Sequence, residues 1–335
     1  MAVGRIRKDS TARIFGDIFR TPAMRLATLL PAASNQAVPA VARPDGTWVP
    51  LASFLGAGSL RLEDHLSGIL GQTVQVSKQA AAWPGPKLHP GEFSFLPPIV
   101  RPPAFRDFYA FEAHVKTARA KRGLEVPAAW YELPVFYFSN HNALVGHDAP
   151  VFAPAGSHEL DYELELGVVI GRGGRDIPAE RAWTHVAGFT ILNDWSARDL
   201  QRQEMTAGLG PAKGKDFATA VGPWLVTRDE FTDRIDGERL TLEMTARVNG
   251  RELSRGNVAS LHHSIPRLVA QASRDVELFP GDLIGTGTVG TGCILELGPE
   301  LTGGWLKPGD FIELEIERLG VLRNTIVPRP AAATG

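Results

Sequence analysis

Apolar residues along this chain fall mostly in short runs with alternating polar positions, separated by glycine and proline. Such a pattern predicts many short strands joined by turns. We expect strands at residues 162–171, 188–195, 240–248, 281–287 and 311–318. The Asn249-Gly250 pair after the third of these predicts a tight hairpin turn. The sequence therefore indicates an α+β fold that is rich in strands.

Helical spacing is clearest at residues 105–123, where Phe108, Phe111 and Val115 fall on one face and Gly123 ends the pattern. Two further helices are predicted around residues 178–186 and 260–270. Residues 83–103 are dense in proline, which removes backbone donors and disfavours regular structure. We expect this segment to be a boundary or a wrapping linker.

These patterns divide the chain into three parts. Residues 24–95 alternate short apolar runs with turns and predict a small N-terminal domain, while residues 96–330 predict a larger domain. Residues 1–23 are basic and weakly amphipathic, and we interpret them as an extension or leader outside both domains. A transit segment or a surface helix is the alternative; a secretory signal is not expected, because no apolar stretch follows.

Composition excludes several classes of protein. Of the 335 residues, 44% are hydrophobic and 21% are charged, which excludes a disordered chain. Lys and Arg number 35 against 37 Asp and Glu, so the chain lacks the overall basic surplus that would predict nucleic-acid binding. The chain has no run of about 18 apolar residues, so no membrane span is predicted. The single cysteine, Cys293, cannot form an internal disulfide, and we expect a reducing, cytoplasmic location.

Acidic residues supply the first candidate chemistry. Glu163 and Glu165 lie two positions apart in a predicted strand and therefore project from one face. Asp194 ends another apolar strand, and Asp107 lies just before residues 109–114 of the predicted helix. Two like charges on one face need water or a cation, and an all-oxygen set suits Mg²⁺, Mn²⁺ or Ca²⁺.

A structural explanation of these carboxylates stays open. The same alternation recurs at Glu313, Glu315 and Glu317, where we expect a solvated strand face. Asp107 would equally serve as a helix N-cap. Alternation alone therefore does not identify a metal site.

His114 lies on or beside the apolar face of the predicted helix. Most such histidines are packing or surface residues, and a catalytic one needs a carboxylate that orients its ring. Several glutamates could serve, so sequence alone does not choose between the two roles.

Two glycine-containing segments resemble nucleotide-binding motifs without their context. Residues 285–290 fit G-x-G-x-x-G, but residues 293–297 are predicted to be extended where the motif requires a helix. Gly214-Lys215 lacks the first glycine and the Ser/Thr of a phosphate-binding loop. We expect neither segment to bind a nucleotide.

Taken together, several segments resemble the fumarylacetoacetate hydrolase family. In chain order from Asp107 they are DFYAFEAHV, LPVFYFSN, LDYELELGVVIG, ILNDWSARDLQ, LGPAKGKDF, VNG and GDLIGTGT. They extend over about two thirds of the chain, and ELELG followed by NDWSARDLQ is specific to that family. The resemblance implies a mixed β-roll catalytic domain, preceded by the small N-terminal domain that some members carry.

The resemblance also implies a set of site residues. Mg²⁺, or Mn²⁺ or Ca²⁺ in its place, would be bound by Asp107, Glu163, Glu165 and Asp194. Lys215 would lie by the metal and the substrate oxygens, and His114 would be the general base. The implied substrate contacts are Tyr109, Tyr137, Gln201 and Thr288.

Members of the family orient this histidine in two ways. Short members carry a glutamate three residues after it, where this chain has Thr117. In fumarylacetoacetate hydrolase itself the partner is a distant glutamate, and Glu296 occupies the matching place. The resemblance therefore pairs His114 with Glu296. The substrate-binding arginine of that enzyme is replaced by Gly123, and Arg119 or Arg122 would substitute for it.

The implied activity is metal-dependent hydrolysis of a C–C bond in a β-diketo acid. The alternative on the same residues is decarboxylation, hydration, dehydration or isomerisation of a 2-oxo acid. A non-catalytic binding protein is a third class, which the joint presence of His114, Glu296 and Lys215 disfavours. The expected partners are a small diketo or 2-oxo acid and a second copy of the chain in a homodimer, with neither nucleic acid nor membrane.

Overall fold

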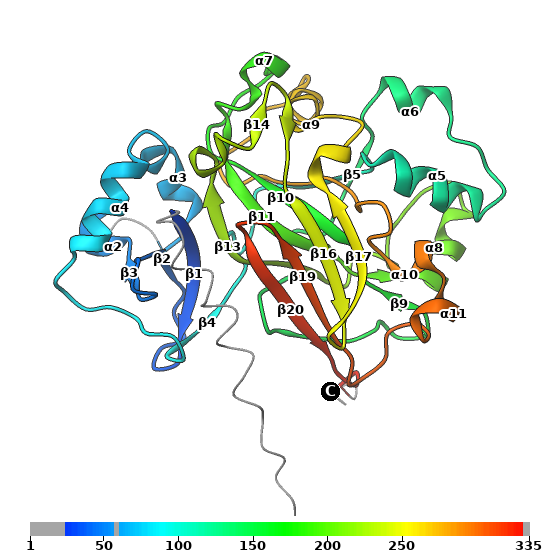
Figure 1. Ribbon diagram of the computed structural model, residues 1–335, viewed down its shortest axis with the longest axis horizontal. Helices are drawn as coiled ribbons and strands as arrows, with labels where there is room; N and C mark the ends of the chain where they lie inside the picture. The colour runs from blue at the N-terminus through cyan, green and yellow to red at the C-terminus, as the bar shows by residue number, and fades with distance from the viewer. Residues whose placement is uncertain (1–23, 57–59, 331–335) are drawn as a thin grey trace, which may run out of the picture.

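The computed structural model describes residues 24–56 and 60–330 (Figure 1). The extension predicted at residues 1–23 lies outside them. Most strands belong to two sheets, the larger in the order β3-β2-β1-β13-β11-β10-β18-β5-β6 and the smaller in the order β17-β16-β19-β20-β8. The smaller sheet packs across β10, β11 and β13 of the larger one. The predicted strand-rich α+β fold is confirmed.

The strands of the larger sheet, with β4 and β7 paired beside this path, are β1 (Arg25–Pro31), β2 (Val38–Ala42), β3 (Trp48–Pro50), β4 (Phe93–Phe95), β5 (Phe105–Phe108), β6 (Phe136–Phe138), β7 (Leu144–Val145), β10 (Leu164–Ile170), β11 (Val186–Asp194), β13 (Thr219–Thr227) and β18 (Leu283–Gly285). Those of the smaller sheet are β8 (Pro150–Val151), β16 (Glu243–Val248), β17 (Arg251–Asn257), β19 (Phe311–Ile316) and β20 (Gly320–Ile326). Two short ribbons pair β9 (Leu160–Asp161) with β12 (Ser196–Ala197) and β14 (Ile235–Asp236) with β15 (Arg239–Leu240).

The helices surround these sheets. They are α2 (Ala52–Leu55), α3 (Glu63–Ile69), α4 (Thr73–Ala82), α5 (Glu112–Ala120), α6 (Ala128–Glu132), α7 (Ala179–Ala182), α8 (Arg198–Met205), α9 (Ile265–Ser273), α10 (Ile294–Leu297) and α11 (Pro299–Thr302), with 3₁₀ turns η2 (Arg228–Phe231) and η3 (Val258–Ser260). No helix in the described part of the chain is long and apolar enough to cross a membrane.

The central strands carry the core. β10, β11 and β13 are buried along their whole length, because helices or the smaller sheet cover both faces. β19 instead alternates buried and half-buried positions, so one of its faces meets solvent as expected. The Asn249-Gly250 turn joins β16 to β17, with φ of 52° and 79° at its two residues.

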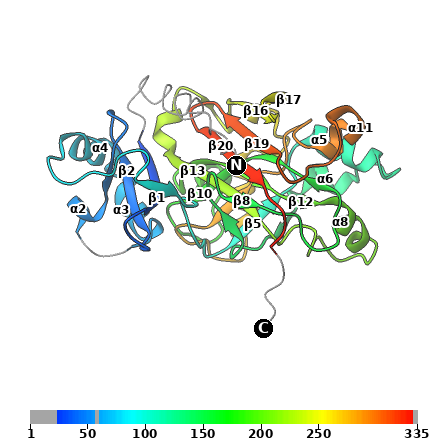
Figure 2. The same ribbon diagram turned by 90° about the horizontal axis from the view of Figure 1, so that it is seen from below.

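The N-terminal unit joins the main body through its sheet. β1 pairs with β13, with Leu26 opposite Leu225, and α2 to α4 pack beside β1 to β3 (Figures 1 and 2). Leu26, Leu66, Phe105 and Leu225 belong to one shared apolar cluster. The proline-rich segment lies between the two parts and contributes β4, which pairs with β1. The division into two domains stays a prediction.

The helix predicted at residues 105–123 is wrong in its first part. Residues Phe105–Phe108 form β5, which pairs with β18 and β6 inside the sheet, and the helix begins at Glu112. Apolar residues spaced by three fit a helix, and they also fit a strand that is buried on both faces, as β5 is. Pairing with β18 and β6 determines that residues 105–108 form a strand. Asp107 is therefore a strand residue, and Phe111 occupies the N-cap that was the structural alternative for Asp107.

Three other predicted segments differ in extent or type. The helices predicted at 178–186 and 260–270 are the shorter or shifted α7 and α9. Residues 293–297, predicted to be extended, contain the one-turn helix α10. Side-chain contacts from a remote residue hold this turn, and they are described below.

Candidate active site

Three carboxylates meet inside the larger sheet. Asp107 comes from β5, Glu165 from β10 and Asp194 from the end of β11, and one oxygen of each lies within 4.8 Å of the others. All three residues are at most 2% exposed. Because β18 lies between β10 and β5, the pairing of these strands brings the three side chains together.

Glycines of β18 and its following loop make room for this carboxylate cluster. A Cβ atom at Gly285 would lie 2.3 Å from Asp107 Oδ1 and 2.9 Å from Glu165 Oε2. Two residues further on, the amide of Gly287 donates to Glu165 Oε2 at 2.9 Å. Gly285 thus leaves space for two of the carboxylates, and Gly287 donates a hydrogen bond to one of them.

The chemistry of the cluster fits a divalent cation. Burial, followed by repulsion from Asp194, raises the pKa of Asp107 well above its usual value, and burial with repulsion from Asp107 does the same for Glu165. The Oδ1 atoms of Asp107 and Asp194 are buried and find no hydrogen-bond partner among the described residues. An all-oxygen donor set with unsatisfied, mutually repelling oxygens suits Mg²⁺, Mn²⁺ or Ca²⁺.

Glu163, the fourth predicted ligand, lies beside this group and is bound by two cationic side chains. Its Oε1 accepts from Arg198 Nη2 at 2.7 Å and its Oε2 from Lys215 Nζ at 2.6 Å. Lys215 also donates to Asp194 Oδ2 at 2.6 Å. Burial opposes the charge on Glu163, but Lys215, Arg198 and His114 together lower its pKa below the usual value.

The predicted substrate contacts surround the carboxylates. The Tyr137 hydroxyl donates to Asp194 Oδ2 at 2.7 Å, and burial together with Asp194 raises the pKa of this phenol well above its usual value. Thr288 is buried, and its hydroxyl has no partner among residues 24–56 and 60–330. Gln201 reaches the group through Arg198 Nη1, which donates to its Oε1 at 3.0 Å.

A histidine–glutamate pair lies at the same site. His114 Nδ1 is 2.6 Å from Glu296 Oε1, although the two residues are 182 positions apart. The pair is buried, and Glu296 Oε2 accepts from the Thr291 amide at 3.0 Å. A carboxylate on Nδ1 makes that nitrogen the donor and leaves Nε2 as the basic one. Thr117 instead bonds the carbonyl of Ala113 within its own helix.

Tyr109 packs against this histidine with its ring edge-to-face, at 5.3 Å between ring centroids. Burial, followed by the charge of Glu163, raises the pKa of Tyr109 to about 12. Arg119 and Arg122 act in the opposite direction on the same phenol. Arg119 lies on helix α5, and Arg122 lies just beyond its end.

Three residues near the site were not predicted from the sequence. Arg198 bridges Glu163, Gln201 and the buried Asp161. Asp161 continues the alternation of Glu163 and Glu165, which is the signal that could have found it. Cys293 donates its thiol to Glu296 Oε1 at 3.6 Å, and burial raises the thiol pKa well above its usual value. The thiol is thus held in its neutral form, as a hydrogen-bond donor to Glu296.

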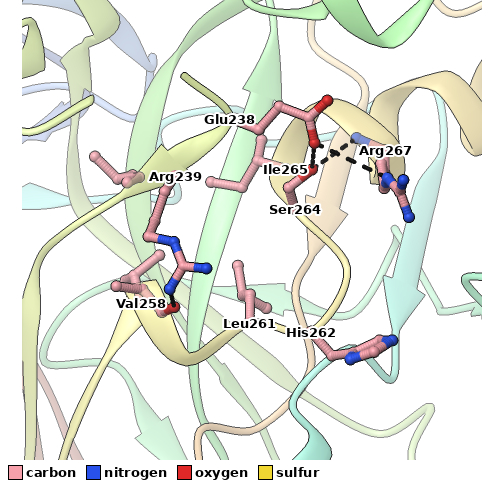
Figure 3. A pocket seen from close by; sticks show the side chains of 10 residues that line it. Glu238, Arg239, Val258, Leu261, His262, Ser264, Ile265 and Arg267 are labelled. Atoms are coloured by element: carbon pink, nitrogen blue, oxygen red, sulfur yellow. Dashed lines mark hydrogen bonds and ion pairs between the residues drawn. The ribbon is translucent and has the colours of Figure 1, made fainter. Parts of the chain in front are cut away.

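A separate hollow lies at the start of α9 (Figure 3). It measures about 210 Å³ and is lined by residues that include Glu238, Arg239, Leu261 and Arg267. Small-molecule sites usually measure roughly 300–1,000 Å³. The hollow contains none of the predicted site residues, so the carboxylate cluster is the candidate active site.

Comparisons with known proteins find similar sequences. The family model described as fumarylacetoacetate (FAA) hydrolase, C-terminal, matches residues 104–327. The chain is 36% identical over 259 residues to the human mitochondrial oxaloacetate tautomerase FAHD2A, with 76% of each chain covered. It is 37% identical over 194 residues to a 2,4-didehydro-3-deoxy-L-rhamnonate hydrolase of Sphingomonas, covering 58% of this chain and 65% of that one.

A solved structure shows the same fold. The 5-carboxymethyl-2-hydroxymuconate delta-isomerase of Mycobacterium smegmatis superposes with a TM-score of 0.66 at 28% identity, covering 91% of this chain and all of that one. These relatives include a tautomerase, a hydrolase and an isomerase, so they support an enzyme without fixing its reaction. The matched region contains every predicted site residue, and the chain belongs to the fumarylacetoacetate hydrolase family.

Proposed function

We propose that this protein is a divalent-cation-dependent hydrolase that cleaves a C–C bond of a β-diketo acid or related 2-oxo acid. The observation that carries the proposal is the His114–Glu296 pair beside a carboxylate cluster with unsatisfied oxygens. A base and a cation site side by side are what such a hydrolysis needs. The hydrolase among the relatives supports this assignment.

Asp107, Glu165 and Asp194 would hold the cation, Mg²⁺ or else Mn²⁺ or Ca²⁺, with Glu163 as the fourth ligand. When bound, the cation would polarise the carbonyl oxygens of the substrate as a Lewis acid. Glu163 would share its oxygens with Lys215 and Arg198, so we expect it to be the weakest of the four ligands.

The remaining chemistry belongs to side chains of this chain. His114 Nε2 would take a proton from water while Glu296 holds Nδ1, and the water oxygen would bond to the substrate carbonyl carbon. The carbonyl electron pair moves to its oxygen, where Lys215 and Gln201 would donate hydrogen bonds. As the carbonyl re-forms, the C–C bond breaks and the leaving carbon takes the proton from His114.

The donors are available for this role. Lys215 carries three N–H groups and uses two on Glu163 and Asp194, which leaves one for substrate. The carbonyl of Gln201 accepts from Arg198, so its amide N–H groups are the ones that would donate to substrate. Tyr137 and Thr288 would add contacts at the carboxylate cluster, and Tyr109 would add one beside His114.

If the substrate carries a second carboxylate, Arg119 and Arg122 are its candidate partners. Arg119 and Arg122 lie close enough to Tyr109 to influence its pKa, and either would pair with an anionic group at that end of the site. Replacing both with methionine should raise KM for dicarboxylic substrates more than for monocarboxylic ones.

Keto–enol tautomerisation is the second candidate. The relative that is 36% identical over 76% of this chain is an oxaloacetate tautomerase. The same His114 would then take its proton from a substrate carbon rather than from water. Incubation of acylpyruvates, fumarylpyruvate, fumarylacetoacetate and oxaloacetate with Mg²⁺ or Mn²⁺ separates the candidates. Two acid products support hydrolysis, whereas an unchanged carbon skeleton with faster enol decay supports tautomerisation.

His114→Ala tests the base that both candidates share. We expect turnover to fall at least about 100-fold, because general-base assistance typically contributes about 10²–10⁴-fold. The rise in melting temperature on adding Mg²⁺ should persist, since His114 is not a proposed ligand. His185→Ala is the control, because that half-buried ring makes its one hydrogen bond within the described chain to the Arg172 carbonyl. Unchanged turnover in His114→Ala would contradict the proposal.

A further inference from the structure

The one-turn helix that carries Glu296 is held by a residue from another part of the chain. A single turn is not stable by itself, and the N–H groups that begin it have no partner within the helix. Cys293, at the N-cap of α10, makes no side-chain capping bond. Asp161 supplies two bonds instead: its Oδ1 accepts from the Ile294 amide at 2.8 Å and its Oδ2 from the Leu295 amide at 3.0 Å.

The same carboxylate contacts the cationic side of the site. Arg198 Nε donates to Asp161 Oδ2 at 2.8 Å, while another nitrogen of this guanidinium donates to Glu163. Both Asp161 and Arg198 are buried, at 0% and 4% exposure. The position of Asp161 is fixed by β9, where it lies opposite Ser196 of β12.

Asp161 thus contacts α10, which carries Glu296, and Arg198, which binds Glu163. It is neither part of the carboxylate cluster nor in contact with His114. Glu296 lies two residues beyond Ile294, so the start of α10 sets where its carboxylate lies. A shift of the turn would lengthen the 2.6 Å contact between Glu296 and His114.

We propose that Asp161 is a positioning residue: it fixes α10 against Arg198 and thereby holds Glu296 on His114. The consequence for turnover rests on the proposed function, in which His114 is the base. The consequence for the His114–Glu296 contact does not. Removal of a group that orients a functional residue typically costs about 10–100-fold in activity or metal affinity.

The test is Asp161→Asn, which keeps the shape and removes the charge. With Mg²⁺ and the substrate of the above screen that the wild type turns over, we expect kcat to fall about 10–100-fold, with KM and the Mg²⁺ midpoint changing less than about 3-fold. In a Glu296→Gln background the same substitution should lower kcat less than about 3-fold, because it acts through Glu296. Equal losses in both backgrounds would overturn the proposal.

Proton NMR of the Mg²⁺-free protein gives a second readout that does not depend on the reaction. The wild type should show a downfield His114 Nδ1–H resonance, identified by its loss in His114→Ala. Asp161→Asn should lose or shift it, and retention at the wild-type position would overturn the proposal. A protein that turns over none of the substrates refutes the proposed function, while this resonance still decides the role of Asp161.

Asp282→Asn is the matched control. Asp282 is a buried aspartate that faces Arg106 at 3.4 Å and accepts from the Phe279 amide at 3.1 Å, outside the site. Its loss should lower the melting temperature while leaving the His114 resonance and kcat within about 3-fold of wild type. Asp161→Ser, which retains one acceptor, gives the same readouts if Asp161→Asn does not fold. A resonance lost equally in the Asp282 variant would mark a general structural effect and refute the assignment.

Discussion

Two segments of this protein carry glutamates two positions apart, and only one of them forms a candidate site. Glu163, just before β10, and Glu165, on β10, are 5% and 1% exposed. Glu313 and Glu315, on β19, lie on the half-buried face of their strand. Both pairs follow from the same alternation of side chains. The difference is what covers that face, because β10 is buried on both sides and β19 on one.

The two segments also differ in how their charges are compensated. Glu315 pairs with Arg247 at 2.6 Å in contact with solvent, where water already screens both groups. At β10, Lys215 and Arg198 compensate Glu163, whereas burial and repulsion raise the pKa of Glu165. A partly compensated buried cluster favours a bound cation, and a half-buried pair that contacts solvent does not.

The largest effect should come from removing charge at the buried segment. Glu165→Gln combined with Asp194→Asn should abolish turnover, because it removes two of the three gathered ligands. Wild-type protein should gain about 2.7 kcal/mol of unfolding free energy at a Mg²⁺ concentration near 100 times Kd, and this variant should gain none. Thermal unfolding with and without Mg²⁺ measures the difference.

The matched control makes the same change of charge on β19. Glu313→Gln combined with Glu315→Gln should keep both turnover and the Mg²⁺-dependent gain. Surface changes of this kind usually alter stability by at most about 0.5 kcal/mol. A loss of the Mg²⁺ response in this control would show that the response is not specific to the carboxylate cluster.

A second effect concerns the cationic side chain at each segment, which is Lys215 beside Glu163 and Arg247 beside Glu315. In the cation-free protein, Lys215→Met should lower the free energy of unfolding by about 3–5 kcal/mol, because it leaves buried carboxylates uncompensated. Arg247→Met should cost only about 0–1 kcal/mol, since Glu315 stays hydrated. Urea unfolding at neutral pH measures both values, and equal losses would contradict the contrast between the two segments.

The pH dependence of this difference has a definite sign. Burial opposes ionisation of Glu163, but Lys215 and Arg198 outweigh it and hold its pKa below the usual value. The stability that Lys215 and Arg198 give the folded protein through Glu163 is therefore present above the unfolded-state pKa of glutamate, about 4.3. It is lost as the pH falls through the lowered pKa of Glu163 in the folded state. The gap between wild type and Lys215→Met should narrow in acid.

Much of the site followed from the sequence because its residues sit in regular elements or in motifs. Asp194 was expected at a strand end, where it lies, and the resemblance paired His114 with Glu296. Asp107 was misplaced onto a helix boundary, because residues 105–111 fit helical spacing and only pairing with β18 decides their structure.

The residues that sequence reasoning missed act over long separations. Asp161 lies 133 positions from the amide of Ile294 and 37 from Arg198, so no local pattern reveals either contact. A one-turn helix has too few residues for periodicity, and α10 was accordingly expected to be extended. These features are fixed by tertiary contacts of the folded chain.

A smaller effect should come from filling the space beside Asp107 and Glu165, which the absence of a side chain at Gly285 leaves open. The glutamates of β19 need no such space. Gly285→Ala places a methyl group 2.3 Å from Asp107 Oδ1, so a carboxylate must move away from the others. We expect the Mg²⁺ concentration for half-maximal stabilisation to rise at least about 10-fold, equivalent to about 1.4 kcal/mol. Gly68→Ala in α3 is the control, because no atom lies within 4 Å of the added Cβ, and alanine favours a helix by about 1 kcal/mol. An unchanged midpoint in Gly285→Ala would mean that the cation does not bind between Asp107 and Glu165. The burial of Glu163 and Glu165 would then not be enough to explain why this segment, unlike β19, forms a candidate site.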